Sequence, residues 1–220
     1  MQRANGFPLY KVAWGRIDEG DLLDIARTRA FVDNLLMRTP TYCRAQASNL
    51  LAHVLAGMEQ CVDGKHLPSR PLPFGPNKRL IAYFGHDTNV EAIGGLMGTS
   101  WIPNGWVQYQ SPPVGQHVFE LRKKQDTRPK EGWFVRVYFI SLTMDQMATG
   151  CRVDEDYPPS MCPVSIGDRS VLHSSFDIPF DAFRMGLRFF IDPYAVHSDL
   201  AGWLMGLPLP IQLPPRPNFG

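Results

Sequence analysis

The stretch Leu80-Ile-Ala-Tyr-Phe-Gly-His-Asp-Thr-Asn89 decides how the rest of this sequence is interpreted. Five apolar residues, 80–84, lie between a proline-rich loop and Gly85, which is a pattern typical of a buried parallel strand. His86 and Asp87 follow at once, and the residues after them have the spacing of a short helix. We therefore expect an imidazole, a carboxylate and the free N–H groups of a helix start at the carboxyl end of a strand. That arrangement suits the binding of a phosphate group.

Outside this stretch, hydrophobic periodicity predicts further helices and strands. Proline-rich or polar segments are expected to be irregular, including the loop 150–168 and the tail after Asp199, which we expect to be too interrupted for a regular helix. The predicted order is helix, helix, strand, helix, strand, strand, which favours an α/β fold with a partial parallel or mixed sheet flanked by helices. The helices are expected at 21–37, 41–60, 89–96 and 180–190, and two antiparallel strands at 118–122 and 133–142.

The composition is that of an ordinary globular protein. The chain has 220 residues, of which 44% are hydrophobic and 20% charged, and its formal net charge is +1. We expect no nucleic-acid partner, because the densest basic cluster, at 122–130, is short and falls between two predicted strands. We expect no membrane partner either, because no apolar run reaches the ~18 residues of a membrane span. The first residues contain no apolar stretch of the signal-peptide type.

The cysteines leave two arrangements open. There are four, at positions 43, 61, 151 and 162, and an even number permits two disulfides or none. A local bridge between Cys151 and Cys162 is plausible, whereas Cys43 falls on the apolar face of a predicted helix, where a buried free thiol is common. No pair has the C-x-x-C spacing of a structural zinc site.

The run Phe84-Gly-His-Asp-Thr-Asn-Val-Glu-Ala-Ile-Gly-Gly95 resembles the C-terminal signature of the histidine acid phosphatases, in particular the bacterial branch of phytases and glucose-1-phosphatases. Trp14-Gly-Arg-Ile17 and Pro112-Pro-Val-Gly-Gln-His-Val-Phe-Glu120 are similar to two further segments of that family. The resemblance covers residues 5–150 and corresponds to the C-terminal half of a family member. It implies a phosphoglycerate-mutase-like histidine phosphatase architecture that lacks its N-terminal part. In that interpretation residues 1–190 are the C-terminal portion of the domain, and 191–220 are a proline-rich tail of unknown role.

The resemblance also implies roles for individual residues. Asp87 would be the catalytic proton donor to the departing alcohol, and His86 would contact the phosphate. Thr88 and Asn89 would bind substrate through their backbone N–H groups, and Gly85 would allow the tight turn before them. The substrate would be a small phosphomonoester such as a sugar phosphate or an inositol phosphate, hydrolysed without a metal or organic cofactor. A periplasmic or secreted location is implied in the same way.

One family motif is missing from the sequence. No Arg-His-Gly-x-Arg-x-Pro segment occurs, and in the family that segment supplies the nucleophilic histidine and two phosphate-binding arginines. We therefore expect the chain to supply the His-Asp half of an active site and to be inactive alone. The alternative is a non-catalytic remnant, or an anion-binding subunit that needs a separate N-terminal half. In either case apolar faces and a sheet edge would be exposed, favouring association with that half or with a second copy.

Less specific interpretations of the central stretch also stand. Asp87 and Thr88 suit an ordinary helix N-cap. His86 on its own is more often a hydrogen-bonded core histidine than a ligand. A metal-dependent His-Asp phosphohydrolase would need several more histidine and aspartate ligands, and the other histidines show no supporting spacing.

Overall fold

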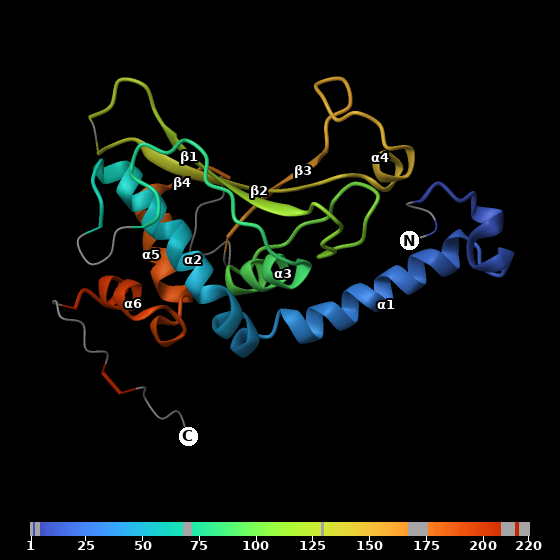
Figure 1. The fold of residues 1–220 in the computed structure, drawn as a ribbon, viewed down its shortest axis with the longest axis horizontal. Coiled ribbons are helices and arrows are strands. Elements are labelled where there is room, and N and C mark those ends of the chain that lie inside the picture. The colour runs from blue at the N-terminus through green and yellow to red at the C-terminus, as the bar shows by residue number, and fades with distance from the viewer. Residues whose placement is uncertain are drawn as a thin grey trace.

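An antiparallel sheet forms one side of the molecule, and most of the helices lie on one face of that sheet (Figure 1). The computed structural model describes residues 2, 5–67, 72–128, 130–166, 176–207 and 214–215. Within these residues no helix is both long enough and apolar enough to cross a membrane.

The longest helix, α2 (Pro40–Asp63), is the centre of the core. Thr39 precedes it, Pro40 occupies the first helical position, and Gly64 ends it in the left-handed conformation with φ 67°. Its apolar stripe is buried, as the predicted helix at 41–60 requires: Cys43, Ala47, Leu51, Leu55 and Met58 all lie in the core.

Helix α1 (Glu19–Met37) projects from the rest of the molecule (Figure 1). It begins with a reciprocal capping box in which the side chains of Asp18 and Asp21 each accept the other's backbone N–H. None of its residues is buried, and among the described elements it contacts mainly α3 (Asp87–Leu96) and α2. The predicted helix at 21–37 is confirmed, but it is an arm and not a core helix.

The sheet consists of β1 (Gln116–Lys123), β2 (Trp133–Ser141), β3 (Ser160–Val164) and β4 (Ile178–Pro179). β2 pairs with each of the other three strands, always antiparallel. Alternate β2 residues, from Val135 to Ser141, point into the core, where the ring of Phe139 stacks on that of Trp101 with centroids 4.9 Å apart. The predicted antiparallel pair at 118–122 and 133–142 is therefore confirmed.

The prediction of a buried parallel strand at 80–84 is wrong. The segment is outside any strand, and the side chains of Leu80 and Phe84 are 84% and 98% exposed. A strand is stable only when its N–H and C=O groups pair with neighbouring strands, and no described strand lies beside this one. The apolar sequence is thus of the kind found in a buried strand, while the partners that would bury it are absent from the described residues.

The remaining elements complete the chain. Besides the 3₁₀ helix Leu9–Gly15 near the start, α4 (Met144–Thr149) follows β2, and α5 (Phe180–Phe190) occupies the span predicted for a helix at 180–190. Two expectations were wrong: β3 lies inside the expected loop 150–168, and α6 (Ser198–Met205) forms after Asp199. Helix α6 is possible because its eight residues contain no proline.

Residues after 190 pack on α2. The backbone N–H of Asp192 donates to Ser48 Oγ at 2.9 Å, and that of His197 donates to Asn49 Oδ1 at 3.1 Å. Leu200 of α6 is fully buried. The division into 1–190 and a separate tail at 191–220 stays a prediction, and most of 206–220 is outside the described residues.

All four cysteines carry free thiols. Cys43 is fully buried, as expected, and burial raises the pKa of its thiol. The plausible bridge between Cys151 and Cys162 is not formed, and Cys162 Sγ lies 3.0 Å from the carbonyl oxygen of Ile102.

Candidate functional site

The His-Asp pair lies at the start of α3, where Figure 1 places the helix between α2 and α1. His86 is the N-cap residue, with extended backbone at φ −106° and ψ 168°, and Asp87 is the first helical residue. The backbone N–H of His86 donates to Asn89 Oδ1 at 2.9 Å, which closes the first turn. A Cβ atom at Gly85 would lie 2.7 Å from that same oxygen, so the turn needs glycine there.

The helix N-terminus is less open than the sequence predicted. The N–H of Thr88 donates to Asp87 Oδ1 at 2.8 Å, and the N–H of Asn89 donates to the His86 carbonyl at 3.0 Å. Both groups expected to bind an anion therefore have partners within the turn. An anion would reach Thr88 only after the Asp87 side chain moved away, whereas His86 and Asp87 themselves are exposed to solvent.

Two glycines fix the position of α3. A Cβ at Gly94 would lie 2.4 Å from Trp101 Cζ3, and one at Gly95 would lie 2.5 Å from Cys43 Sγ. Both contacts are shorter than real Cβ contacts, so only glycine lets α3 approach this closely.

Arg38, the residue that ends α1, packs against the loop that follows α3. Its guanidinium lies over the rings of Trp101 and Tyr109, 5.1 Å and 4.3 Å from their centroids. Its Nη2 donates to the carbonyl oxygen of Thr99 at 2.7 Å. Burial lowers the pKa of Arg38 from its usual value. No sequence pattern indicated this packing of Arg38, because its partners come from a loop far along the chain.

Carboxylates outnumber cations around the start of α3. Glu91 is one helical turn after Asp87, and its pKa is raised to about 7, first by burial and then by the nearby charges of Asp33 and Asp87. Arg29 and Arg38 are the cations that act on it. A phosphate dianion at this site would need further positive charge from outside the cluster.

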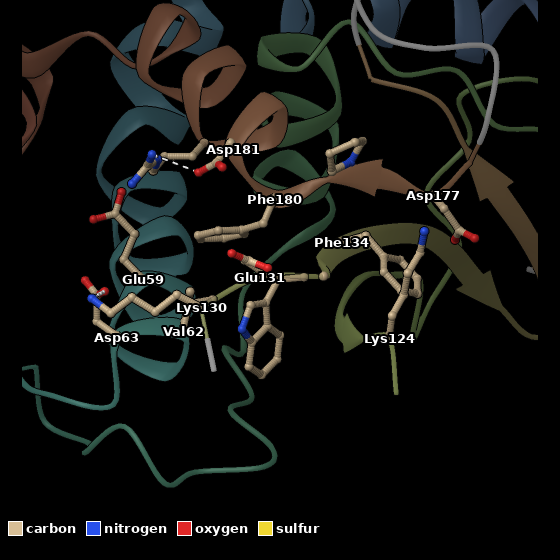
Figure 2. A pocket seen from close by; sticks show the side chains of 14 residues that line it. Glu59, Val62, Asp63, Lys124, Lys130, Glu131, Phe134, Asp177, Phe180 and Asp181 are labelled. Atoms are coloured by element: carbon tan, nitrogen blue, oxygen red, sulfur yellow. Dashed lines mark hydrogen bonds and ion pairs between the residues drawn. The ribbon is translucent and has the colours of Figure 1, made fainter. Parts of the chain in front are cut away.

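A hollow lies elsewhere, between the end of α2, the β1–β2 connection and the start of α5 (Figure 2). It has a volume of about 890 Å³ and does not include the His-Asp pair. Figure 2 shows the Lys130 side chain reaching toward Asp63, and Lys130 Nζ is 2.8 Å from Asp63 Oδ1. Arg184 is likewise bonded to Asp181 at 2.9 Å. Two of the cations that line the hollow are therefore already paired with carboxylates.

No cluster of metal-ligating side chains occurs within the described ranges. The site therefore consists of an exposed imidazole and carboxylate on a rigid helix start, with an acidic neighbour behind them. It offers a proton donor or acceptor and one phosphate contact, and among the described residues at this helix start it holds no second histidine positioned as a nucleophile.

The chain is similar in sequence and structure to known phytases. It is 26% identical over 163 residues to phytase AppA of Escherichia coli strain K12, a match that covers 72% of this chain and 35% of that protein, in its C-terminal part. It also superimposes on Hafnia alvei phytase in complex with myo-inositol hexakis sulphate, with a TM-score of 0.73 and 25% identity over 89% of this chain. The resemblance to the bacterial phytases is confirmed.

The phytase-like chain is short relative to these proteins, since it covers 46% of the Hafnia alvei phytase chain. It therefore spans about half the length of its solved relatives. Citrobacter braakii phytase, at 24% identity and a TM-score of 0.71, supports the fold alone. No family model matches the chain. The α/β fold of histidine phosphatase type, predicted from the sequence, is confirmed for this phytase-like chain.

Proposed function

We propose that this chain supplies the proton-donor half of a phosphomonoester-hydrolysing site. The observation that carries the proposal is the position of His86 and Asp87: exposed at the rigid start of a helix, within a phytase-like fold. The dipole of a helix favours negative charge at its start.

In this proposal Asp87 protonates the leaving alcohol. The bond between phosphorus and the ester oxygen breaks, the phosphoryl group passes to a nucleophile, and the ester oxygen takes the proton of the Asp87 carboxyl group. General acid help of this kind is typically worth ~10²–10⁴ in rate. His86 contacts a phosphate oxygen, and the N–H groups of Thr88 and Asn89 bind substrate once the Asp87 side chain has turned toward the leaving group. The chemistry of this half needs neither metal nor organic cofactor.

The proposed substrate class is a small sugar phosphate or inositol phosphate. Supporting this are the relatives, which are phytases, and the myo-inositol hexakis sulphate and tartrate complexes of the Hafnia alvei enzyme. Because carboxylates exceed cations around Glu91, the further cations for the phosphate come from outside this cluster. By the same resemblance we place the protein in the periplasm or outside the cell.

The partner in this proposal is the polypeptide half that carries the nucleophile. Two exposed apolar surfaces support a missing partner: the unpaired segment 80–84, and the outer side of α1 with Phe31, Leu35 and Leu36. Exposed apolar patches of this kind mark interaction sites, and an extended unpaired segment is a template for strand addition. Self-association through the same surfaces is the competing outcome.

A non-catalytic protein is the second candidate. It is favoured by the internal hydrogen bonds of the Thr88 and Asn89 N–H groups, which leave neither amide free for an anion. Titration with inorganic phosphate, followed by NMR of these two amides, separates an anion-binding subunit, which shifts both signals, from an inert remnant, which shifts neither.

The test compares residues 1–220 with a longer protein. The DNA before codon 1 is read, and any continuous frame that adds an Arg-His-Gly-x-Arg-x-Pro segment is expressed together with residues 1–220. We expect hydrolysis of p-nitrophenyl phosphate at mildly acidic pH by the longer protein and none by residues 1–220. Turnover by residues 1–220 alone contradicts the need for a second half. Failure of such a longer, folded protein to turn over contradicts the function itself.

A further inference from the structure

Glu91 is a buried carboxyl group at the junction of α1 and α3. It lies one helical turn after Asp87, on the same side of α3, and its side chain is only 6% exposed. Among the described residues its carboxyl group forms no salt bridge or side-chain hydrogen bond. A buried carboxylate without a partner is costly, whereas a neutral carboxylic acid at the same place costs far less.

The charges that face Glu91 come from both helices. Asp33 and Arg29 belong to α1, Arg38 ends α1, and Asp87 lies on α3. Both cations also have other partners, since Arg29 donates to the carboxylate of Asp33 and Arg38 Nη2 donates to the Thr99 carbonyl, and they offset the effect of burial and of the two carboxylates on Glu91 only in part. An ionised Glu91 would therefore be largely removed from water and would face the charges of two other carboxylates, Asp33 and Asp87.

The arm α1 depends on this junction. None of its residues is buried, and its main contacts with the other described elements are with α3 and α2 (Figure 1). A helix with so little tertiary packing is marginal in water on its own. Small changes in the repulsion between Asp33 and Glu91 are therefore large relative to what holds α1 in place.

We propose that Glu91 is a proton-dependent positioning residue, which holds α1 against α3 as a neutral carboxylic acid and releases α1 when it loses its proton. The docked form is favoured in acid, where the raised pKa keeps Glu91 neutral. As the pH rises toward 7, the undocked form, in which Glu91 is solvated and ionised, becomes more populated relative to the docked form. The consequence for His86 and Asp87 rests on the proposed function: the docked arm holds α3, and hence the catalytic pair, in place at acidic pH.

Hydrogen exchange of α1 as a function of pH tests the release. Protection of the 19–37 amides, corrected for the intrinsic pH dependence of exchange, is measured by mass spectrometry between pH 5 and 8. In the wild-type chain we expect protection to fall by up to about tenfold per pH unit between 5 and 7, because one proton is released on undocking. In Glu91→Gln, which is neutral at every pH, protection should stay constant. Glu120→Gln, an exposed carboxylate on β1, is the matched control and should behave as wild type.

Parallel profiles for wild type and Glu91→Gln would overturn the proposal. Should Glu91→Gln fail to fold, ¹³C NMR of the wild-type Glu91 carboxyl group decides instead. A midpoint well above that of Glu120 supports the proposal, and an equal midpoint contradicts it. Neither measurement uses phosphatase activity, so failure of this inference and failure of the proposed function are told apart.

Discussion

The side-chain oxygen of Asn89 accepts the backbone N–H of His86, 2.9 Å away, and so ties the first residue of the His-Asp pair to the third residue of α3. Only glycine at position 85 leaves room for this bond, because a Cβ atom there would lie 2.7 Å from the same oxygen. The backbone of the His-Asp pair is therefore held by Gly85 and Asn89, together with the bond from the Thr88 N–H to the Asp87 side chain.

Loss of the Asn89 side chain should weaken the start of α3. In Asn89→Ala the His86 N–H loses its partner, and loss of such a cap costs about 0.5–2 kcal/mol. The change is measured as a lower urea midpoint with an unchanged m-value. Asn104→Ala, in an exposed turn, serves as the control and should shift the midpoint by less. Equal shifts in the two variants would show that the cap contributes nothing.

Gly94→Ala should destabilise the protein, although alanine is the better helix former. In an open helix this change stabilises by up to ~1 kcal/mol. Here the new Cβ would lie 2.4 Å from Trp101, and overpacking of this kind costs about 1–3 kcal/mol. The sign of the change in unfolding free energy is the readout, and a gain in stability would show that α3 does not approach Trp101 as described.

The helices were predictable from the sequence because their signals are local. Capping carboxylates, the Thr39-Pro40 start and the apolar stripe of α2 gave helix limits within a few residues of those observed. The prediction for 80–84 was wrong because an apolar composition shows that a segment is suited to burial. It does not show whether partner strands are present. The short strand β3 was missed since its residues 160–164 include a proline and alternate exposed with buried positions against β2.

The pH dependence of stability should contain two opposing contributions. Burial lowers the pKa of His117 to about 4, so its contribution is lost as the pH falls from about 6.5 to 4. The raised pKa of Glu91, about 7, means that its contribution is lost as the pH rises from about 4.5 to 7. The two slopes oppose each other between about 4.5 and 6.5.

Removing one group should therefore unmask the other. In Glu91→Gln the contribution of His117 remains, so we expect the unfolding free energy to rise with pH. Between pH 4 and 6.5 the difference from wild type should grow by about 2 kcal/mol. In His117→Gln only the decline toward pH 7 should remain. Urea melts at half-unit pH steps measure both, and identical profiles for the two variants and wild type would contradict the burial of these groups.

Arg188→Met should cost about 2 kcal/mol or more. Arg188 is bonded to the buried Glu59 of α2 at 3.2 Å, and its removal leaves that carboxylate without its partner. It also loses the bond from Arg188 to the Leu204 carbonyl, which holds α6. Arg27→Met, which breaks the exposed pair with Asp24, is the matched control and should change the unfolding free energy by less than ~0.5 kcal/mol. A similar cost for both would mean that Arg188 does not join α5 to α2.

The residues of the candidate site were predictable from the sequence, whereas their surroundings were not. The His-Asp pair, its glycine and the helix start are contiguous in sequence, so the motif located them. The role of Arg38 and the state of Glu91 depend on how α1, α3 and the 99–109 loop meet, which no local pattern records. Glu91 could have been noticed from its spacing, four residues after Asp87 on one face of a predicted helix.

The central claim is that Asp87 gives its proton to the leaving alcohol, and the dependence on the leaving group tests it most directly. In the longer, active protein, kcat is measured for p-nitrophenyl phosphate, whose leaving group needs little protonation, and for glucose 1-phosphate, whose leaving group needs a proton. We predict that Asp87→Asn lowers kcat for glucose 1-phosphate by ~10²–10⁴ and for p-nitrophenyl phosphate by far less. An equal loss for both substrates would contradict the role of Asp87 as proton donor.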